Sequence, residues 1–436
     1  MDAAPGRWWG GPLDVERLAW SAVSDARRAA QSVADARGLR VTVGTETSLV
    51  AASFAAIEHL RVGGRAAEAW APLSGFFAAA DGWVRVHANY PHHAAALRRA
   101  LGLGDRAAVD RAALHGVIAG RAALDVEQVV TAERGIAVAV RSPREWSAHP
   151  HGTATATDPW STVRVTGDRP ALPPSPDEIL DGVRVLDLTR VVAGPTCSQL
   201  LACLGADVLR LDPPGRPELL DQHLASAMGK RSAAVDLAAR PEVLNRLLPD
   251  ADVVLLDYRP GSLARFGLDP DALTERHPHL VVASLSAWGE HGPWGARAGF
   301  DSIVQAASGI AVVCAAADGR PGALPVQALD HATGHRMAAE VLRLLAQGRA
   351  GVVRISLLGA ARELLAAPPP APEATSPLAA RTVAVPSPYG PVVTAPPALI
   401  LDGATLERPV GGYAATTAGL EAGPDLSHHP GERNHP

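Results

Sequence analysis

The stretch that most constrains the fold is residues 182–212, which have the pattern of a strand, a tight turn, a helix and a second strand. Residues 183–188 are apolar enough for a buried parallel strand, with β-branched valine at two positions. Pro195 suits the first position of a helix, because its missing N–H costs nothing there, and Gly205 suits the position after the helix end. We therefore expect a right-handed βαβ unit, with its first turn at the carboxyl edge of the sheet, where open α/β sheets bind ligands.

The same alternation continues along the chain. Further apolar runs predict strands at residues 208–211, 253–257 and 281–286 and helices at residues 195–204, 241–248, 270–276 and 325–347. Alternating strands and helices are typical of a doubly wound parallel sheet. The first third of the chain predicts a hairpin at residues 70–87 and helices at residues 92–101 and 106–118. The expected fold class is α/β, with a doubly wound, Rossmann-like parallel sheet domain and a smaller α+β domain.

Composition and charge exclude several classes of partner. The 436 residues carry a net charge of −5, which provides no basic field to attract nucleic acid or an anionic membrane. No apolar run reaches the roughly 18 residues of a membrane span, and the N-terminus lacks the layout of a secretory signal. Cys197, Cys203 and Cys314 have no metal-binding spacing and suit a reducing compartment as buried thiols. We expect a cytoplasmic protein with no nucleic-acid, membrane or metal partner.

A series of motifs between residues 182 and 334 resembles the class III CoA-transferase family, which includes formyl-CoA and carnitine CoA-transferases and the α-methylacyl-CoA racemases. The motifs keep the family's order: VLDLTRVVAGPTCSQLLACLGADVLRLDPPG, MGKRSAAVDL, ADVVLLDYRPGSLARFGL, SLSAWGEHGPWGARAGFDSIVQAASG and ALDHATG. The resemblance implies transfer of CoA between carboxylic acids by a homodimer, with an acyl-CoA and an acceptor acid as substrates and no permanently bound cofactor. No GxGxxG fingerprint or Walker sequence is present, so NAD and nucleoside triphosphates are not expected ligands.

The N-terminal third carries the same resemblance in an unusual place. The stretches ADGWVRVHANYPHHAAALRRALG and VAVRSPREWSAHPHG are similar to the small domain that follows the catalytic half in this family, but here they precede it. Either one set of family parts stands in permuted order, or a truncated copy is fused to a catalytic copy. The expected divisions are residues 1–37 as a tail and helix, 38–153 as the small domain, 154–177 as a linker, 178–365 as the CoA-binding catalytic domain, and 366–436 as a C-terminal segment with a disordered tail.

Asp330, in the motif ALDHATG, stands at the position of the family's catalytic aspartate. The resemblance implies that its carboxylate attacks an acyl-CoA thioester and passes through an aspartyl-CoA thioester, because a covalent nucleophile divides one hard exchange into easier steps. Its expected place early in a helix favours the ionised carboxylate through the helix dipole. His331 and His335 lie off the Asp330 face of such a helix, and we expect packing or surface roles for them.

The CoA-binding residues that the resemblance implies lie in and after the first three βα turns. They are Val192, Ala193, Lys230, Arg231, Tyr258, Arg259 and Arg265. Arginine and lysine are expected partners for the pyrophosphate and 3′-phosphate of CoA. Two residues depart from the family pattern: Pro213 replaces a phosphate-binding residue, and Asp257 places a carboxylate where it would repel phosphate. Arg210 and Arg216 are the candidates to compensate for Pro213.

Two other functions remain open from the sequence. In AGFDSI, Phe300 stands where the racemase branch has a histidine; a racemase needs two bases, and phenylalanine supplies none. Acyl-CoA racemase or epimerase activity is therefore disfavoured, and it would require Asp301 or His331 as a substitute base. A degenerate, non-catalytic CoA-ester-binding protein is the third hypothesis, because Pro213, Asp257 and the rearranged order depart from the family pattern.

Overall fold

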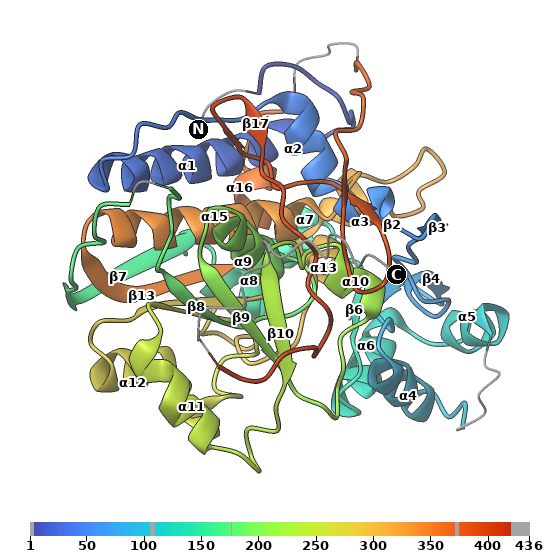
Figure 1. Ribbon diagram of the computed structural model, residues 1–436. Helices are drawn as coiled ribbons and strands as arrows, with labels where there is room; N and C mark the ends of the chain where they lie inside the picture. Colours follow the sequence, from blue (N-terminus) through green and yellow to red (C-terminus); the bar gives the residue numbers. More distant parts are fainter. Residues whose placement is uncertain (1–3, 105–109, 176, 371–374, 420–436) are drawn as a thin grey trace, which may run out of the picture.

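A seven-stranded sheet forms the centre of the computed structural model, which describes residues 4–104, 110–175, 177–370 and 375–419 (Figure 1). The strand order is β10 (Lys230–Ala234), β9 (Asp207–Asp212), β8 (Arg184–Leu188), β11 (Val253–Leu256), β12 (Val281–Ser286), β13 (Arg349–Ser356) and β7 (Ser161–Asp168). The first six strands run parallel, and β7 pairs antiparallel with β13. Numbered along the chain, the parallel strands have the order 3-2-1-4-5-6 of a doubly wound sheet, which confirms the α/β class.

Helices cover both faces of this sheet (Figure 1). The covering helices are α1 (Val15–Ala36), α9 (Ala193–Cys203) and α15 (Ala328–Ala346) on one face and α11 (Glu242–Leu247) and α12 (Pro270–Arg276) on the other. Val253 and Leu255 of β11 belong to the first core, whereas Val254 and Leu256 belong to the second. Because successive side chains of a strand point to opposite faces, burial of both faces explains the continuous apolar runs in the sequence.

Three strands of the sheet differ from the sequence expectation. Residues 154–177, expected to be a linker, contain β7, which lies along β13 as an edge strand. The strands β10 and β13 were not expected. β10 has the sequence KRSAA, which lacks the apolar run of a buried strand, so its conformation follows from its pairing with β9 rather than from a local pattern.

The N-terminal helix α1 is part of the outer layer of the sheet domain, although it precedes the small domain in the chain. It packs along α15, and Leu18, Val23 and Val33 are buried in the core that they share. At its C-terminal end, the Arg37 guanidinium donates to the carbonyls of Ile179 (3.0 Å) and Asp181 (2.9 Å), just before the first parallel strand. The segment expected to be a separate tail and helix is therefore anchored to the sheet domain.

The smaller α+β region is built on a three-stranded antiparallel sheet. Its strands are β4 (Gly75–Ala79), β5 (Gly82–Val86) and β6 (Ala137–Ala139), and its helices are α4 (Pro91–Ala100), α5 (Arg111–Ala119) and α6 (Ala123–Ala132). The predicted hairpin is confirmed, with Ala79 paired to Gly82 across the turn. Val84 and Val86 of β5 face a core shared with α4, α5 and α6, so Arg85 between them faces the other side of the sheet. Part of the helix expected at residues 106–118 lies outside the described residues.

The remaining elements join the two ends of the chain. The strands β1 (Val43–Gly44), β16 (Ile400–Leu401) and β17 (Ala404–Thr405) form one small sheet, and β14 (Val383–Val385), β15 (Val392–Thr394), β2 (Arg61–Val62) and β3 (Arg65–Ala66) form another. The other helices are α2 (Thr47–Phe54), α3 (Ala56–His59), α7 (Pro143–Ala148), α8 (Pro150–Ala154), α10 (Leu220–Leu224), α13 (Asp301–Ser308), α14 (Ile310–Val313) and α16 (Leu357–Leu365), with 3-10 turns at Leu248–Asp250 and Ala264–Phe266. The C-terminal segment is thus paired with strands that precede the smaller α+β region in the sequence.

Residues 411–419, where a disordered tail was expected to begin, bond to β10. The Thr416 N–H donates to the Ser232 carbonyl (3.0 Å), and the Arg231 guanidinium donates to the Gly419 carbonyl (2.8 Å). The rest of the expected tail, residues 420–436, lies outside the described residues. Within the described ranges, no helix combines the length and the apolar character that crossing a membrane requires.

The packing of α1 on α15 predicts that core residues of α1 stabilise the whole sheet domain. Leu18 is 1% exposed, and Leu18→Ala should lower the free energy of unfolding by about 2–5 kcal/mol, because it leaves a cavity in a close-packed core. Leu124→Ala, at a position that is 52% exposed on α6, is the matched control and should change the free energy of unfolding by less than about 0.5 kcal/mol. Urea unfolding followed by fluorescence measures both, and equal midpoints for the two variants would contradict the assignment of α1 to this domain.

Candidate active site

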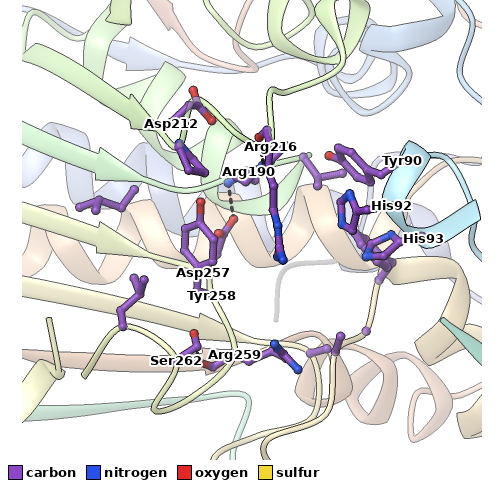
Figure 2. A pocket seen from close by; sticks show the side chains of 18 of the residues that line it. Tyr90, His92, His93, Arg190, Asp212, Arg216, Asp257, Tyr258, Arg259 and Ser262 are labelled. Atoms are coloured by element: carbon purple, nitrogen blue, oxygen red, sulfur yellow. Dashed lines mark hydrogen bonds between the residues drawn. The ribbon is translucent and has the colours of Figure 1, made fainter. Parts of the chain in front are cut away.

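A cavity of about 1020 Å³ lies at the carboxyl edge of the parallel sheet (Figure 2). The turns after β8, β9 and β11 line one side of it, as the topology of an open α/β sheet predicts. Tyr90, His92 and His93, at the start of α4 in the smaller region, line the opposite side, and Arg216 extends into the space between. The cavity is therefore bounded by both parts of a single chain.

Five of the seven predicted CoA-binding residues line this cavity. Two lie at the N-terminus of α9 and three follow β11: Val192, Ala193, Tyr258, Arg259 and Arg265. Their positions result from the parallel strands, whose carboxyl ends all meet at one edge of the sheet.

The other two, Lys230 and Arg231, do not line the cavity. The Lys230 ammonium is buried beneath α9, where it lies 2.9 Å from Ser198 Oγ and 3.6 Å from Asp187 Oδ2, and burial lowers its pKa to about 8. The Arg231 guanidinium forms an ion pair with Asp207 on the neighbouring strand (2.6 Å). Both side chains project from the amino-terminal end of the edge strand β10 rather than from the carboxyl edge of the sheet, and neither lines the cavity.

The two departures from the family pattern at Pro213 and Asp257 have local explanations. Arg210 is fully buried between Asp212 and Glu218 and faces no ligand, whereas Arg216 lines the cavity beside Pro213. Burial raises the pKa of Asp257 well above its usual range, although its carboxylate accepts the Arg190 N–H (2.6 Å, dashed in Figure 2). A carboxyl group with a raised pKa carries less charge at a given pH, so the expected repulsion of phosphate is reduced.

Glu218 organises the first βα turn. Its carboxylate accepts the Val191 N–H (3.0 Å), a guanidinium N–H of Arg210 (3.0 Å) and the Tyr90 hydroxyl (2.5 Å). Burial opposes ionisation of Glu218, but Arg210 and Arg190 outweigh it and hold its pKa at about 2. Val191 has φ of 65°, which is strained for a β-branched residue and persists only where surrounding contacts enforce it. The turn that begins α9 is thus held in one conformation from three sides.

Asp330 lies in the first turn of α15, and its side chain reaches the large cavity. Its N–H donates to Asp301 Oδ2 (2.9 Å), and its own carboxylate accepts no hydrogen bond from the described residues. Burial, together with the negative charges of Asp301 and Asp257, raises its pKa well above the usual range. The expectation that the helix dipole keeps Asp330 ionised is therefore corrected: a dipole contributes less than desolvation and two neighbouring carboxyl groups.

A second cavity of about 300 Å³ meets the first at Asp330. The residues that line both cavities are Val191, Val192, Phe300 and Asp330. The remaining wall of the second cavity is contributed by α2, α3, α9 and α10, by the segment before α15, and by Arg85 of β5 with the loops on either side of the β4–β5 hairpin. The Asp330 side chain is thus accessible from both cavities.

The histidines near Asp330 are packing residues, as the sequence analysis preferred. His335 stacks on Phe54 and the His331 ring lies tilted against it (ring centroids 5.5 and 5.2 Å apart), and burial lowers the pKa of His335 to about 4 and that of His331 to about 3. Phe300 stacks on His87 with 3.8 Å between ring centroids, and burial lowers the pKa of His87 well below its usual range. None of these imidazoles is poised to accept and return a proton near neutral pH, so no observation favours a racemase.

Several residues that line the large cavity were not predicted from the sequence. They include Tyr90, His92, His93, Arg190 and Ser262. The first three belong to the stretch VHANYPHH, in which aromatic and polar residues follow directly after a strand. A cluster of this kind could have indicated a ligand site, but only the fold shows that it faces the cavity at the edge of the large sheet.

The strand order and the cavity define an α/β protein with its ligand site at the carboxyl edge of a doubly wound sheet. Residues 180–392, just under half of the chain, match the family described as CoA-transferase family III. The resemblance drawn from the motifs is confirmed over these residues.

Individual relatives agree with the family match. The chain is 39% identical over 203 residues to a probable fatty acyl-CoA transferase of Mycobacterium tuberculosis, with 42% of this chain and 51% of that protein covered. It is 37% identical over 176 residues to a succinate–glutarate CoA-transferase of Agrobacterium fabrum, with 36% and 44% covered. A crystal structure of a hypothetical protein from Mycobacterium tuberculosis has 39% identity, a TM-score of 0.41, and coverage of 44% and 58%. The chain spans about half the length of the curated relatives it matches.

The raised pKa of Asp330 predicts how the stability of an Asp330→Asn variant depends on pH. In the wild type, the unfolded chain ionises this group near pH 4, whereas the folded chain resists ionisation, so the contribution to stability falls as the pH rises from about 4 through the folded pKa. Asparagine does not titrate. Asp330→Asn should therefore match the wild type in melting temperature near pH 4 and exceed it increasingly toward pH 8.

Thermal melts between pH 4 and pH 8 measure this difference. Asp250→Asn, at a side chain that is 64% exposed, is the matched control and should show no comparable rise. A melting-temperature difference that is largest at low pH would contradict the raised pKa.

Proposed function

We propose that this protein is an acyl-CoA:carboxylate CoA-transferase that acts through a covalent aspartyl-CoA thioester on Asp330. The single observation that carries the proposal is the position of Asp330, whose uncommitted carboxylate stands where two cavities meet. It lies within the segment that belongs to CoA-transferase family III, and relatives named for this activity include a formyl-CoA:oxalate CoA-transferase of Rhodopseudomonas palustris.

The proposed chemistry uses Asp330 twice. Its carboxylate attacks the thioester carbonyl of the acyl-CoA, and the C–S bond breaks to release CoA thiolate and leave an aspartyl–acyl anhydride. The thiolate then attacks the aspartyl carbonyl, which releases the first acid as its carboxylate and leaves the aspartyl-CoA thioester. The acceptor carboxylate repeats these steps in reverse, so Asp330 is regenerated and no net proton is consumed.

The raised pKa of Asp330 supports this role. Only the ionised form of Asp330 attacks; in that form a more basic carboxylate is a better nucleophile, and its burial removes the hydration that would otherwise weaken the attack. The neighbouring Asp301 carboxylate accepts the Asp330 N–H and so holds the first turn of α15 in place. The reactive group is therefore positioned on a buried helix rather than on a loop.

The large cavity is the proposed site for CoA. Arg216, Arg259 and Arg265 line it, and they form no ion pair among the described residues, so their charges are available for phosphate groups. Free N–H groups at the N-terminus of α9 add donors of the kind that bind anions. Homodimer formation and a cytoplasmic location, both expected from the sequence, stay predictions.

The first test removes the nucleophile. Asp330→Asn should lower the transfer rate by at least about a thousandfold, because the covalent step is lost and only substrate positioning remains. CoA binding should persist, since asparagine keeps the size of the side chain. Hydroxylamine added to wild type with its acyl-CoA should convert Asp330 to a hydroxamate that peptide mass spectrometry detects. Asp318→Asn, at an exposed turn, is the control that should keep full activity, and full transfer by Asp330→Asn would refute the mechanism.

The second test concerns CoA itself. Arg259→Ala and Arg265→Ala should each weaken CoA binding by roughly tenfold, which corresponds to about 1.4 kcal/mol, because each removes a cation from the proposed phosphate site. Added salt should reduce the difference in CoA affinity between these variants and the wild type, because salt screens contacts between cations and phosphate groups. Calorimetric titration measures the affinities, with Arg349→Ala on β13 as the control outside the cavity. Unchanged affinity in both cavity variants would place CoA elsewhere.

A further inference from the structure

Arg85, on β5, is a buried guanidinium that forms no ion pair with any of the described residues. Its side chain is 8% exposed, and it forms no ion pair or side-chain hydrogen bond within the described ranges. Its Nε is buried without a partner. A buried charge that lacks a partner lowers the stability of a protein, so a group of this kind indicates a ligand that supplies the missing partner.

Aromatic rings lie against the Arg85 guanidinium. The guanidinium carbon lies 4.8 Å from the centre of the Trp70 ring and 4.8 Å from that of Phe76, so aromatic rings cover the flat group. Contacts of this kind leave the edge of the guanidinium, with its N–H donors, unoccupied. Paired N–H donors on one edge match the two oxygens of a carboxylate, which is the usual bidentate partner of arginine.

Arg85 lines the smaller cavity but not the larger one. The reacting carbonyl must lie at Asp330, on the boundary between the two cavities. A group bound to Arg85 therefore lies in the smaller cavity and not in the larger one. The wall of the smaller cavity also includes the apolar side chains of Leu324 and Val326, which suit a short hydrocarbon segment.

The other ionisable groups near Arg85 do not neutralise it. Asp301 is close enough to raise its pKa, but the Asp301 carboxylate accepts the Gln305 amide (2.5 Å) and the Asp330 N–H (2.9 Å). Glu58 and Asp330 are the acidic residues in the cavity wall, and neither forms an ion pair with Arg85. Burial lowers the pKa of the Arg85 guanidinium only to about 10, so it remains a cation at neutral pH.

From these observations we infer that Arg85 binds a second, non-reacting carboxylate, and that the acid exchanged by this protein is a dicarboxylic acid. One carboxyl group of the acid reacts at Asp330, and the other pairs with Arg85 inside the smaller cavity. The inference rests on the proposed function only for the identity of the reacting group. The binding of a free diacid by Arg85 does not depend on it.

The experiment compares two four-carbon acids that differ by one carboxylate. Succinyl-CoA and butyryl-CoA serve as donors for wild type, Arg85→Met and Arg85→Lys, with Arg349→Met as the control for loss of a surface arginine. The wild type should prefer succinyl-CoA in kcat/KM by roughly tenfold to a hundredfold, the usual range for a charge-assisted hydrogen-bonded pair. In Arg85→Met, kcat/KM should fall with succinyl-CoA but not with butyryl-CoA, so the preference is lost. Arg85→Lys should recover part of the preference. Equal kcat/KM for both donors in the wild type would overturn the inference.

Stability and binding measurements distinguish a binding role from a structural one. Since Arg85 has no fixed anion, Arg85→Met should melt no lower than wild type; a large drop would assign Arg85 to the fold and count against the inference. Titration with free succinate should raise the melting temperature of wild type but not of Arg85→Met. If no transfer occurs with either donor while this succinate effect depends on Arg85, the proposed function fails and the diacid site stands. If transfer occurs without any discrimination by Arg85, the diacid site fails and the proposed function stands.

Discussion

The site depends on one buried carboxylate, Glu218. It accepts hydrogen bonds from the strained Val191 N–H, from Arg210 and from the Tyr90 hydroxyl, so it joins the first βα turn of the sheet to the small domain. Removing one partner from a buried, hydrogen-bonded charge leaves the others unpaired, which is why such clusters hold one conformation. The turn that begins α9, and with it one wall of both cavities, has its shape because these contacts outweigh the strain at Val191.

Around this anchor, the protein holds several groups in states that do not favour stability. Asp330 and Asp257 have raised pKa values, and Arg85 is a buried cation without a fixed anion. An apolar residue at each of these positions would avoid the free-energy cost of burying an ionisable group. All three line one or both of the two cavities, and perturbed ionisable groups in a cleft are typical of functional sites.

The N-terminal segments show how little chain order constrains the final assembly. The helix α1 precedes the small domain but packs on α15, and β7 follows the small domain but extends the large sheet beside β13. The C-terminal strands pair with strands from the first seventy residues. The cavity that Tyr90 and His93 line together with Asp330 is therefore built within one chain.

The sequence by itself determined the doubly wound fold and the cavity-lining positions Val192, Ala193, Tyr258, Arg259 and Arg265, because parallel strands leave continuous apolar runs and their following turns all meet at one edge. Only the tertiary structure decided that Lys230 and Arg231 serve the fold, since a cation next to a motif looks the same whether it faces a ligand or an internal carboxylate. Only the tertiary structure could place Arg85 in the second cavity and raise the pKa of Asp330. Burial and the charges of distant residues set these properties, and neither quantity exists until the chain has folded.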